Sequence, residues 1–322
     1  MRVPRLLLLL GALTLLAALL PGSALADGKA AAAARPKVDS TTFERAQVAP
    51  MVALLESLPH GSELARLKLY VGTDAEIVNR CGAGTMACYD PISERMVVSG
   101  ESDEVAGISR EAVIAHEYGH HIANNRAGGI WTAFAAGTLR WSTYERVCES
   151  KRAGEAFPGN ESEHYWANPG EAFAQAYSQL VIPSEEWHYS PLFRPDRTAL
   201  RLLHEDVVDP AEPRQLSWSV GAPAGAGRPI ALATALPADG RYSRTLRVPY
   251  DGRIRVRVHG EDGARVRASL LDPESGAVLA AAGPGAGGVT HLRFADCGHR
   301  TLRLEVSPLG APAPFRVDLL SP

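Results

Sequence analysis

Residues 115–121, AHEYGHH, place two histidines four positions apart, with a glutamate directly after the first. On an α-helix such residues are separated by about 40° around the axis and one turn along it, so the imidazoles of His116 and His120 face the same way. Two imidazoles so placed can bind one tetrahedral zinc ion. Glu117 can then act as general base toward a metal-activated water. The spacing predicts a catalytic zinc helix.

The residues after the motif narrow the class of zinc site. His121 lies about 140° from His116 around the helix, so we expect it at the surface or as a capping side chain. A third histidine ligand would require the pattern x-x-G-x-x-H after His120. Ala123 stands where the pattern has Gly, and Arg126 stands where it has His. All four methionines precede the motif, which excludes a Met-turn and with it the metzincin class.

A glutamate on a later helix is the other common third ligand. NPGEAFAQAY begins with Asn168 as a helix cap and Pro169 in the first helical position, and Glu171 follows two residues later. Glu171 could instead be the acid of a capping box, which is a structural role. We take it as the ligand because small residues after it would let the two helices pack closely: Ala172, Ala174 and Ala176. Other candidates are the aspartates and Glu155, Glu161, Glu163, Glu185 and Glu186.

H-E-x-G-H followed about 50 residues later by N-x-x-E-A-F-A-x-A-Y resembles the gluzincin metallopeptidases, in particular the branch that includes anthrax lethal factor-type proteases. The resemblance covers roughly residues 64–190. It implies a zincin-like α+β domain that hydrolyses peptide bonds with one Zn²⁺. In that branch a tyrosine that stabilises the transition state shortly precedes the glutamate. Tyr165 is one position nearer than expected and His164 has the expected spacing, so both are candidates.

These assignments predict a zinc peptidase that acts on peptides or proteins. Two other functions remain open on the same residues: a catalytically silent binding protein, and a zinc hydrolase of non-peptide amides. The intact Glu117 argues against the silent protein, because binding alone does not need a general base.

The elements that must position these residues follow from periodicity and capping. Ser109 is a good N-cap for the zinc helix. We expect strands over 64–72 and 94–100, and the second of them could be an edge that adds an extended peptide or an ordinary core strand. The helices are expected over 43–58, 110–125 and 169–180.

The chain changes character after about residue 212. Six short runs alternate apolar residues with arginine or other polar residues, and Gly, Pro and Asp turns separate them, which predicts an all-β sandwich. This region resembles the pre-peptidase C-terminal domain of secreted bacterial peptidases, and such a domain could bind protein or polysaccharide. The expected organisation is a zincin-like domain over 43–195, a helix and linker over 196–213, and the sandwich over 214–322.

The N-terminal residues predict export. Arg2 and Arg5 precede an apolar run from Leu6 to Leu20, and small residues then suit cleavage of a signal peptide after Ala26. We expect a secreted protein with residues 27–42 disordered at its mature N-terminus, and no membrane association after cleavage. The whole chain has 33 basic against 36 acidic residues and no basic run, which argues against nucleic acid as a partner.

The four cysteines are an even number in a chain predicted to be exported, which indicates disulfides. Cys81 and Cys88 flank the Gly-rich segment GAGTMA, which could bring them together. By elimination, Cys148 would then pair with Cys297.

Overall fold

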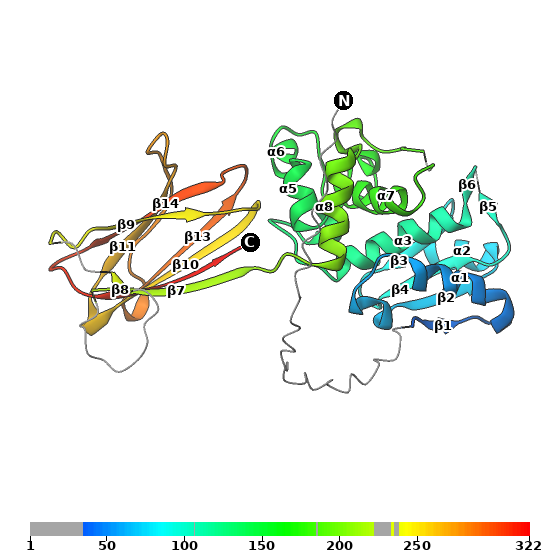
Figure 1. The fold of residues 1–322 in the computed structure, drawn as a ribbon, viewed down its shortest axis with the longest axis horizontal. Helices are drawn as coiled ribbons and strands as arrows, with labels where there is room; N and C mark the ends of the chain where they lie inside the picture. The colour runs from blue at the N-terminus through cyan, green and yellow to red at the C-terminus, as the bar shows by residue number, and fades with distance from the viewer. Residues whose placement is uncertain (1–34, 106, 185, 222–232, 235–237) are drawn as a thin grey trace, which may run out of the picture. The chain divides into compact units, whose positions relative to one another are not determined.

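The computed structural model describes residues 35–105, 107–184, 186–221, 233–234 and 238–322. The predicted signal peptide lies outside these residues. The described chain has an α+β part followed by a part built from antiparallel sheets (Figure 1). This agrees with the predicted order of fold classes.

A four-stranded sheet forms the base of the α+β part, with strand order β1-β2-β4-β3. β1, β2 and β4 are parallel, whereas β3 runs antiparallel to β4 and lies at the edge. Of the two alternatives for the strand over 94–100, the edge strand is wrong and the core strand is confirmed, because β4 is paired on both sides. The strands are β1 (Lys37–Asp39), β2 (Lys68–Gly72), β3 (Ala87–Asp90) and β4 (Arg95–Ser99).

The N-terminal strand β1 differs from the prediction of disorder through residue 42. Its three residues pair in parallel with Lys68–Tyr70 of β2. This pairing satisfies the backbone hydrogen-bonding groups of the segment. The composition of the segment gave no reason to expect a strand here.

Both faces of this sheet are covered by helices, as the near-continuous burial of β2 and β4 requires. Leu69 and Met96 point into the main core with helices α1 (Arg45–Ser57) and α3 (Arg110–Asn124). The alternate residues Tyr70 and Val97 contact Ile77 of helix α2 (Asp74–Cys81) on the opposite face. The remaining helices are α4 (Ala133–Ala136), α5 (Leu139–Tyr144), α6 (Val147–Arg152), α7 (Pro169–Val181) and α8 (Arg197–Val208).

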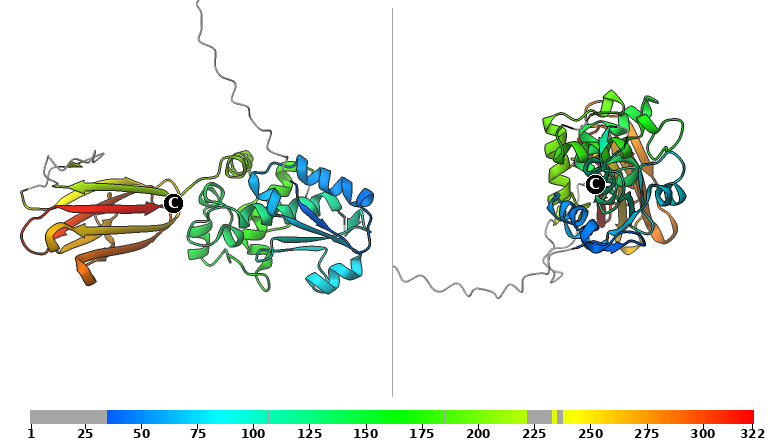
Figure 2. Two further views of the ribbon diagram at one scale, coloured as in Figure 1. Left: turned by 90° about the horizontal axis from the view of Figure 1, so that it is seen from below. Right: turned by 90° about the vertical axis from the view of Figure 1, so that its right-hand side faces the viewer.

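The C-terminal part contains two sheets around one apolar core (Figure 2). Trp218 and Val256 from one sheet and Leu304 from the other belong to this core. The five-stranded sheet has the order β13-β10-β15-β7-β8, with β7 (Arg214–Val220), β8 (Ala233–Thr234), β10 (Gly252–Gly260), β13 (Val289–Asp296) and β15 (Phe315–Ser321). The four-stranded sheet has the order β12-β11-β14-β9, with β9 (Tyr242–Arg247), β11 (Val266–Leu271), β12 (Val278–Ala282) and β14 (Thr301–Pro308).

Both predicted disulfides are present. Cys81 pairs with Cys88 and Cys148 pairs with Cys297, each with an S–S distance of 2.00 Å. Disulfides are typical of proteins outside the cytosol. No helix in the described part of the chain is both long and apolar enough to span a bilayer.

Candidate metal centre

Helix α3 carries the H-E-x-x-H motif, and it is capped at its N-terminus and packed into the main core. Ser109 caps its start, with the Oγ accepting a hydrogen bond of 3.2 Å from the backbone N–H of Ala112. Ile114, Tyr118 and Ile122 of this helix are buried in the main core. This packing fixes the rotation of the helix, so that the face with His116 and Glu117 turns toward α7 and the adjacent cavity.

Helices α3 and α7 approach closely where both have small residues. A Cβ added at Gly119 would lie 2.9 Å from the Cα of Ala174 and 3.1 Å from its carbonyl oxygen. Ala172, Ala174 and Ala176 are all fully buried. The close packing predicted from these alanines is confirmed, and it places the first turn of α7 beside the histidines.

Glu171 lies in that first turn and joins the two histidines. Its Oε2 is 3.2 Å from His116 Nε2, and its Oε1 is 3.2 Å from His120 Nε2. One ligand atom from each residue lies within 4.8 Å of the others, and the described part of the chain has no second group of this kind. Asn168 caps α7 as predicted, with its Oδ1 accepting from the backbone N–H of Gly170, and both carboxylate oxygens of Glu171 face the histidines rather than completing a capping box. These three residues could therefore hold a metal ion.

The hydrogen bonds of Gln175 indicate which nitrogen of His116 carries the proton. Gln175 Nε2 donates to the carbonyl oxygen of Glu186 at 3.0 Å, so its Oε1 must be the atom that faces His116 Nδ1 at 3.2 Å. An amide oxygen only accepts, so Nδ1 carries the proton and Nε2 of the neutral ring keeps its lone pair. That lone pair points at a carboxylate oxygen, an arrangement that a cation between the two would satisfy.

Burial and charge set the acidities in this group. Burial raises the pKa of Glu117, although the two histidines partly oppose the rise. Burial would also raise the pKa of Glu171, but His120 and His116 together hold it well below its usual range. In the same way burial would lower the pKa of His120, and the Glu171 carboxylate instead raises it to about 9. The Glu171 carboxylate is thus held ionised by its histidine neighbours despite its burial.

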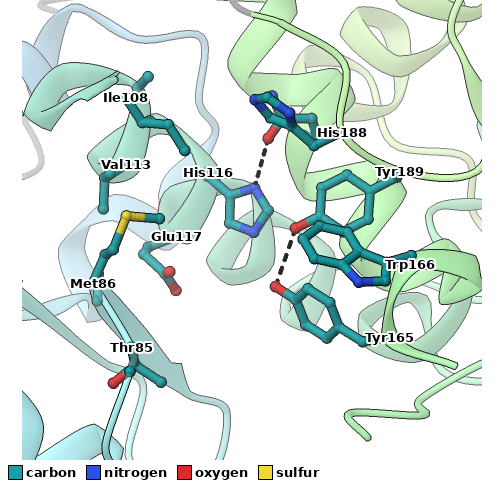
Figure 3. Close-up of a pocket in the computed structure, with 14 residues that line it drawn as sticks. Thr85, Met86, Ile108, Val113, His116, Glu117, Tyr165, Trp166, His188 and Tyr189 are labelled. Carbon is teal, nitrogen blue, oxygen red and sulfur yellow. Dashed lines mark hydrogen bonds between the residues drawn. The ribbon is translucent and has the colours of Figure 1, made fainter. Parts of the chain in front are cut away.

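Two tyrosine hydroxyls reach the same carboxylate. Tyr165 donates to Glu171 Oε2 at 2.8 Å, and Tyr189 donates to the same oxygen at 3.3 Å. The two hydroxyls are 3.1 Å apart, and Figure 3 shows them pointing toward each other beside His116. The Tyr189 ring also stacks on the His116 ring, with centroids 6.1 Å apart and planes 14° apart.

The two residues considered as oxyanion stabilisers, Tyr165 and His164, lie in different surroundings. Tyr165 lies at the metal group, whereas His164 is exposed and stacks on Phe157 with ring centroids 3.6 Å apart. Tyr189 is a residue that sequence reasoning missed. It follows Glu171 by 18 positions, in a stretch without helical or strand periodicity.

Of the alternative carboxylates, only Glu161 interacts with the group. It accepts a hydrogen bond of 2.8 Å from Asn168 Nδ2, and burial together with the charge of Glu171 raises its pKa. It is not a member of the metal-binding group, and neither are Glu155, Glu163 and Glu186. Glu185 lies outside the described residues.

The prediction that His121 lies at the surface or caps the helix is wrong. His121 is fully buried, with Nδ1 2.9 Å from the Tyr89 hydroxyl and Nε2 2.9 Å from the carbonyl oxygen of Glu63. Burial lowers its pKa. The ring is turned away from His116, His120 and Glu171, as its helical position predicts. That side of α3 is nevertheless covered, by Tyr89 of β3 and by the segment with Glu63 that precedes β2.

A cavity of about 480 Å³ opens beside the metal group. Glu117 and His116 lie at its centre in Figure 3, with apolar side chains on one side and aromatic ones on the other. The apolar side includes Met86, Ile108 and Val113, and the aromatic side includes Tyr165, Trp166 and Tyr189. A buried carboxylate, a candidate metal site and hydroxyl donors therefore share one cavity that a ligand can enter.

A comparison with protein-family models finds no match for this chain, and a comparison with curated proteins finds none either.

Proposed function

We propose that this protein is a secreted zinc-dependent peptidase of the gluzincin type. The observation that carries the proposal is the convergence of His116, His120 and Glu171 within 4.8 Å, beside Glu117 in an open cavity. Secretion is supported by the two disulfides, which persist in oxidising compartments.

The donor set favours zinc over harder cations. Two imidazole nitrogens and one carboxylate are ligands that suit Zn²⁺, whereas Ca²⁺ and Mg²⁺ prefer oxygen ligands alone. Three protein ligands also leave one coordination position open, which is typical of catalytic zinc sites. Gln175 supports the site from outside by holding the His116 ring in the tautomer that presents Nε2.

The residues around the group can perform the steps of amide hydrolysis. Zinc held there would activate a water molecule and polarise the scissile carbonyl. Glu117 accepts a proton from the attacking water and returns it to the leaving amine. Its burial raises its pKa, which makes the carboxylate a better base than an exposed glutamate. The Tyr165 hydroxyl donates to Glu171 in the absence of substrate. When substrate binds, the same hydroxyl can donate to the oxyanion instead.

The edge strand β3 supports an extended peptide as the substrate. Among the described strands β3 pairs only with β4, so its other edge has unpaired backbone groups. Ala87 at the start of β3 lines the cavity, together with Gly84, Thr85 and Met86 before it. A peptide added along this edge would pass Glu117 and the metal group.

The test measures metal and cleavage on the same preparation. The purified mature protein should contain about one zinc per chain and should cleave members of a peptide library, and a chelator should abolish cleavage until zinc is returned. Glu171→Ala should lose most of the zinc, whereas the exposed control Glu163→Ala should keep it. Zinc binding without cleavage of any peptide would contradict the peptidase, and full zinc occupancy in Glu171→Ala would contradict the ligand set.

A further inference from the structure

The outer face of the five-stranded C-terminal sheet carries a row of arginines. Along β10 the apolar residues are buried, and the alternate residues Arg253, Arg255 and Arg257 are exposed. The neighbouring strands add Arg293 from β13 and Arg316 from β15, both exposed. We call these five arginines the arginine face.

The register of the strands places like charges opposite each other. Arg255 of β10 pairs directly with Arg293 of β13, and Arg257 pairs with His291. Like charges directly opposite on a sheet are destabilising. This arrangement therefore lowers the stability of the sheet. A solvated face with mixed charges would not have this cost.

The charges on this face are not neutralised from within. Asp318 is the only carboxylate that the described strands of this sheet present on the face, and it is already engaged. Arg316 contacts it at 2.9 Å, Ser217 donates to it at 2.6 Å, and His259 lies 3.3 Å away. Within the described part of the chain, Arg253, Arg255, Arg257 and Arg293 form no ion pair.

The composition of the region shows the same bias. Residues 214–322 contain 14 arginines and no lysine against nine Asp and Glu, although the whole chain has more acidic than basic residues. Arginine differs from lysine in presenting a planar fork that binds carboxylate and sulfate groups through two hydrogen bonds. Arginine outnumbers lysine throughout the chain, at 29 to 4, so it is the gathering of five arginines on one face of a sheet that points to recognition of oxyanions.

We propose that the arginine face binds an anionic polysaccharide. Successive arginines on β10 are about 6.8 Å apart along the strand, so they offer a regular series of positive sites to a chain with repeated anionic groups. A shallow hollow of about 170 Å³ lies between Arg255, Arg257, Gln215 and Asp318, where polar side chains can also contact sugar hydroxyls. The outward positions of these strands have no Phe, Tyr or Trp on which nucleic acid bases could stack. This binding is independent of the proposed peptidase activity.

The test uses the full-length mature protein and immobilised polygalacturonate, with neutral dextran as the uncharged comparison. The intact protein should bind polygalacturonate and not dextran, and binding should weaken as salt is raised. The triple variant Arg255→Gln, Arg257→Gln and Arg293→Gln should bind at least tenfold more weakly. Its matched control removes three exposed arginines from elsewhere in the same region: Arg241→Gln, Arg247→Gln and Arg267→Gln.

The control variant should bind within about twofold of the intact protein. Equal losses in the two triple variants would show a general effect of net charge and would overturn the proposal. Binding to phosphatidylglycerol vesicles or to single-stranded DNA through the same arginines, with none to polygalacturonate, would also overturn it in favour of a different partner. Circular dichroism and zinc content establish that both variants are folded before binding is compared.

Discussion

At the scale of single residues, the candidate site depends on which atoms face Glu171. Gln175 fixes the His116 tautomer, and Tyr165 and Tyr189 place two hydroxyls on the carboxylate. Glu117 has no role in that network and faces the cavity. This division separates residues that would hold a metal from the one that would act as base.

Glu117→Gln should keep zinc bound while peptide cleavage falls by about 10³-fold or more. Glutamine preserves the shape of the side chain but cannot accept the proton of the attacking water. Zinc content and kcat are measured on the same sample, with the exposed helix residue Glu111→Gln as the matched control. Loss of zinc from Glu117→Gln would identify Glu117 as a ligand and refute its role as base.

Tyr165→Phe should lower kcat by about 10- to 100-fold with little change in zinc content, because a hydrogen bond to the oxyanion is lost. Tyr189→Phe should lower kcat less, since its hydroxyl contacts Tyr165 at 3.1 Å and is placed to orient it. Steady-state kinetics on one peptide separate kcat from KM. His164→Ala is the comparison, and a larger loss in that variant than in Tyr165→Phe would reverse the assignment.

At the scale of elements, the site is made by the contact between α3 and α7. The two helices touch where Gly119 faces Ala174, and this contact brings Glu171 to the histidines. The 3.2 Å separations in the group follow from the distance between the helix axes. Small residues on both helices therefore allow Glu171 to reach His116 and His120.

Gly119→Ala should destabilise the protein and weaken zinc binding. Alanine favours a helix by about 1 kcal/mol over glycine. The added Cβ would nevertheless lie 2.9 Å from the Ala174 backbone, and overpacking of this kind costs about 1–3 kcal/mol. Thermal unfolding and zinc titration check the result. A rise in Tm with unchanged zinc affinity would show that the helices can separate without harm.

Helix α5 ends at a carboxylate that should make stability depend on pH. Burial, with the nearby charge of Asp196, raises the pKa of Glu145 to about 7. Because the folded pKa is above the unfolded value of 4.5, Glu145 does not destabilise the native state below about pH 4.5, and its unfavourable contribution grows as pH rises through about 7. Glu145→Gln should therefore unfold at a higher temperature than the native protein at pH 8 and at the same temperature at pH 4. An equal difference at both values would contradict this titration.

At the scale of the whole molecule, two apolar cores share one chain. The main core takes its buried residues from Val48 to Val207, and the C-terminal core takes its own from Trp218 to Leu319. The disulfide Cys148–Cys297 links residues 149 positions apart across these two parts. Separate cores indicate that the metal group does not depend on residues of the C-terminal sheets.

A chain that ends at Arg214 and carries Cys148→Ser should keep zinc and some peptidase activity. It should also be less stable, because a disulfide that closes so long a loop contributes up to about 4–5 kcal/mol in the chain-entropy model. Zinc content, cleavage and Tm are compared with those of the full chain. A truncated protein that folds and binds zinc but cleaves nothing would show that the C-terminal part shapes the active site.

Local sequence was sufficient for the parts of this protein that depend on neighbours along the chain. The capped helix with the H-E-x-x-H motif after Ser109, the second helix after Asn168 and the alternating strands of the C-terminal region are all where periodicity and capping place them. The disulfide between Cys81 and Cys88 also follows from their short separation. In each case hydrogen bonds or side-chain spacing within a few residues determine the outcome.

Only the tertiary structure decided the features that depend on residues far apart in sequence. The edge position of β3 depends on the strand order, and the burial of His121 depends on contacts with Tyr89 and Glu63. The hydrogen bonds of Tyr165 and Tyr189 to Glu171, and the exposed position of His164, depend on how the segments on either side of α7 fold over it. No local pattern encodes these contacts, because they form when separate elements pack against one another.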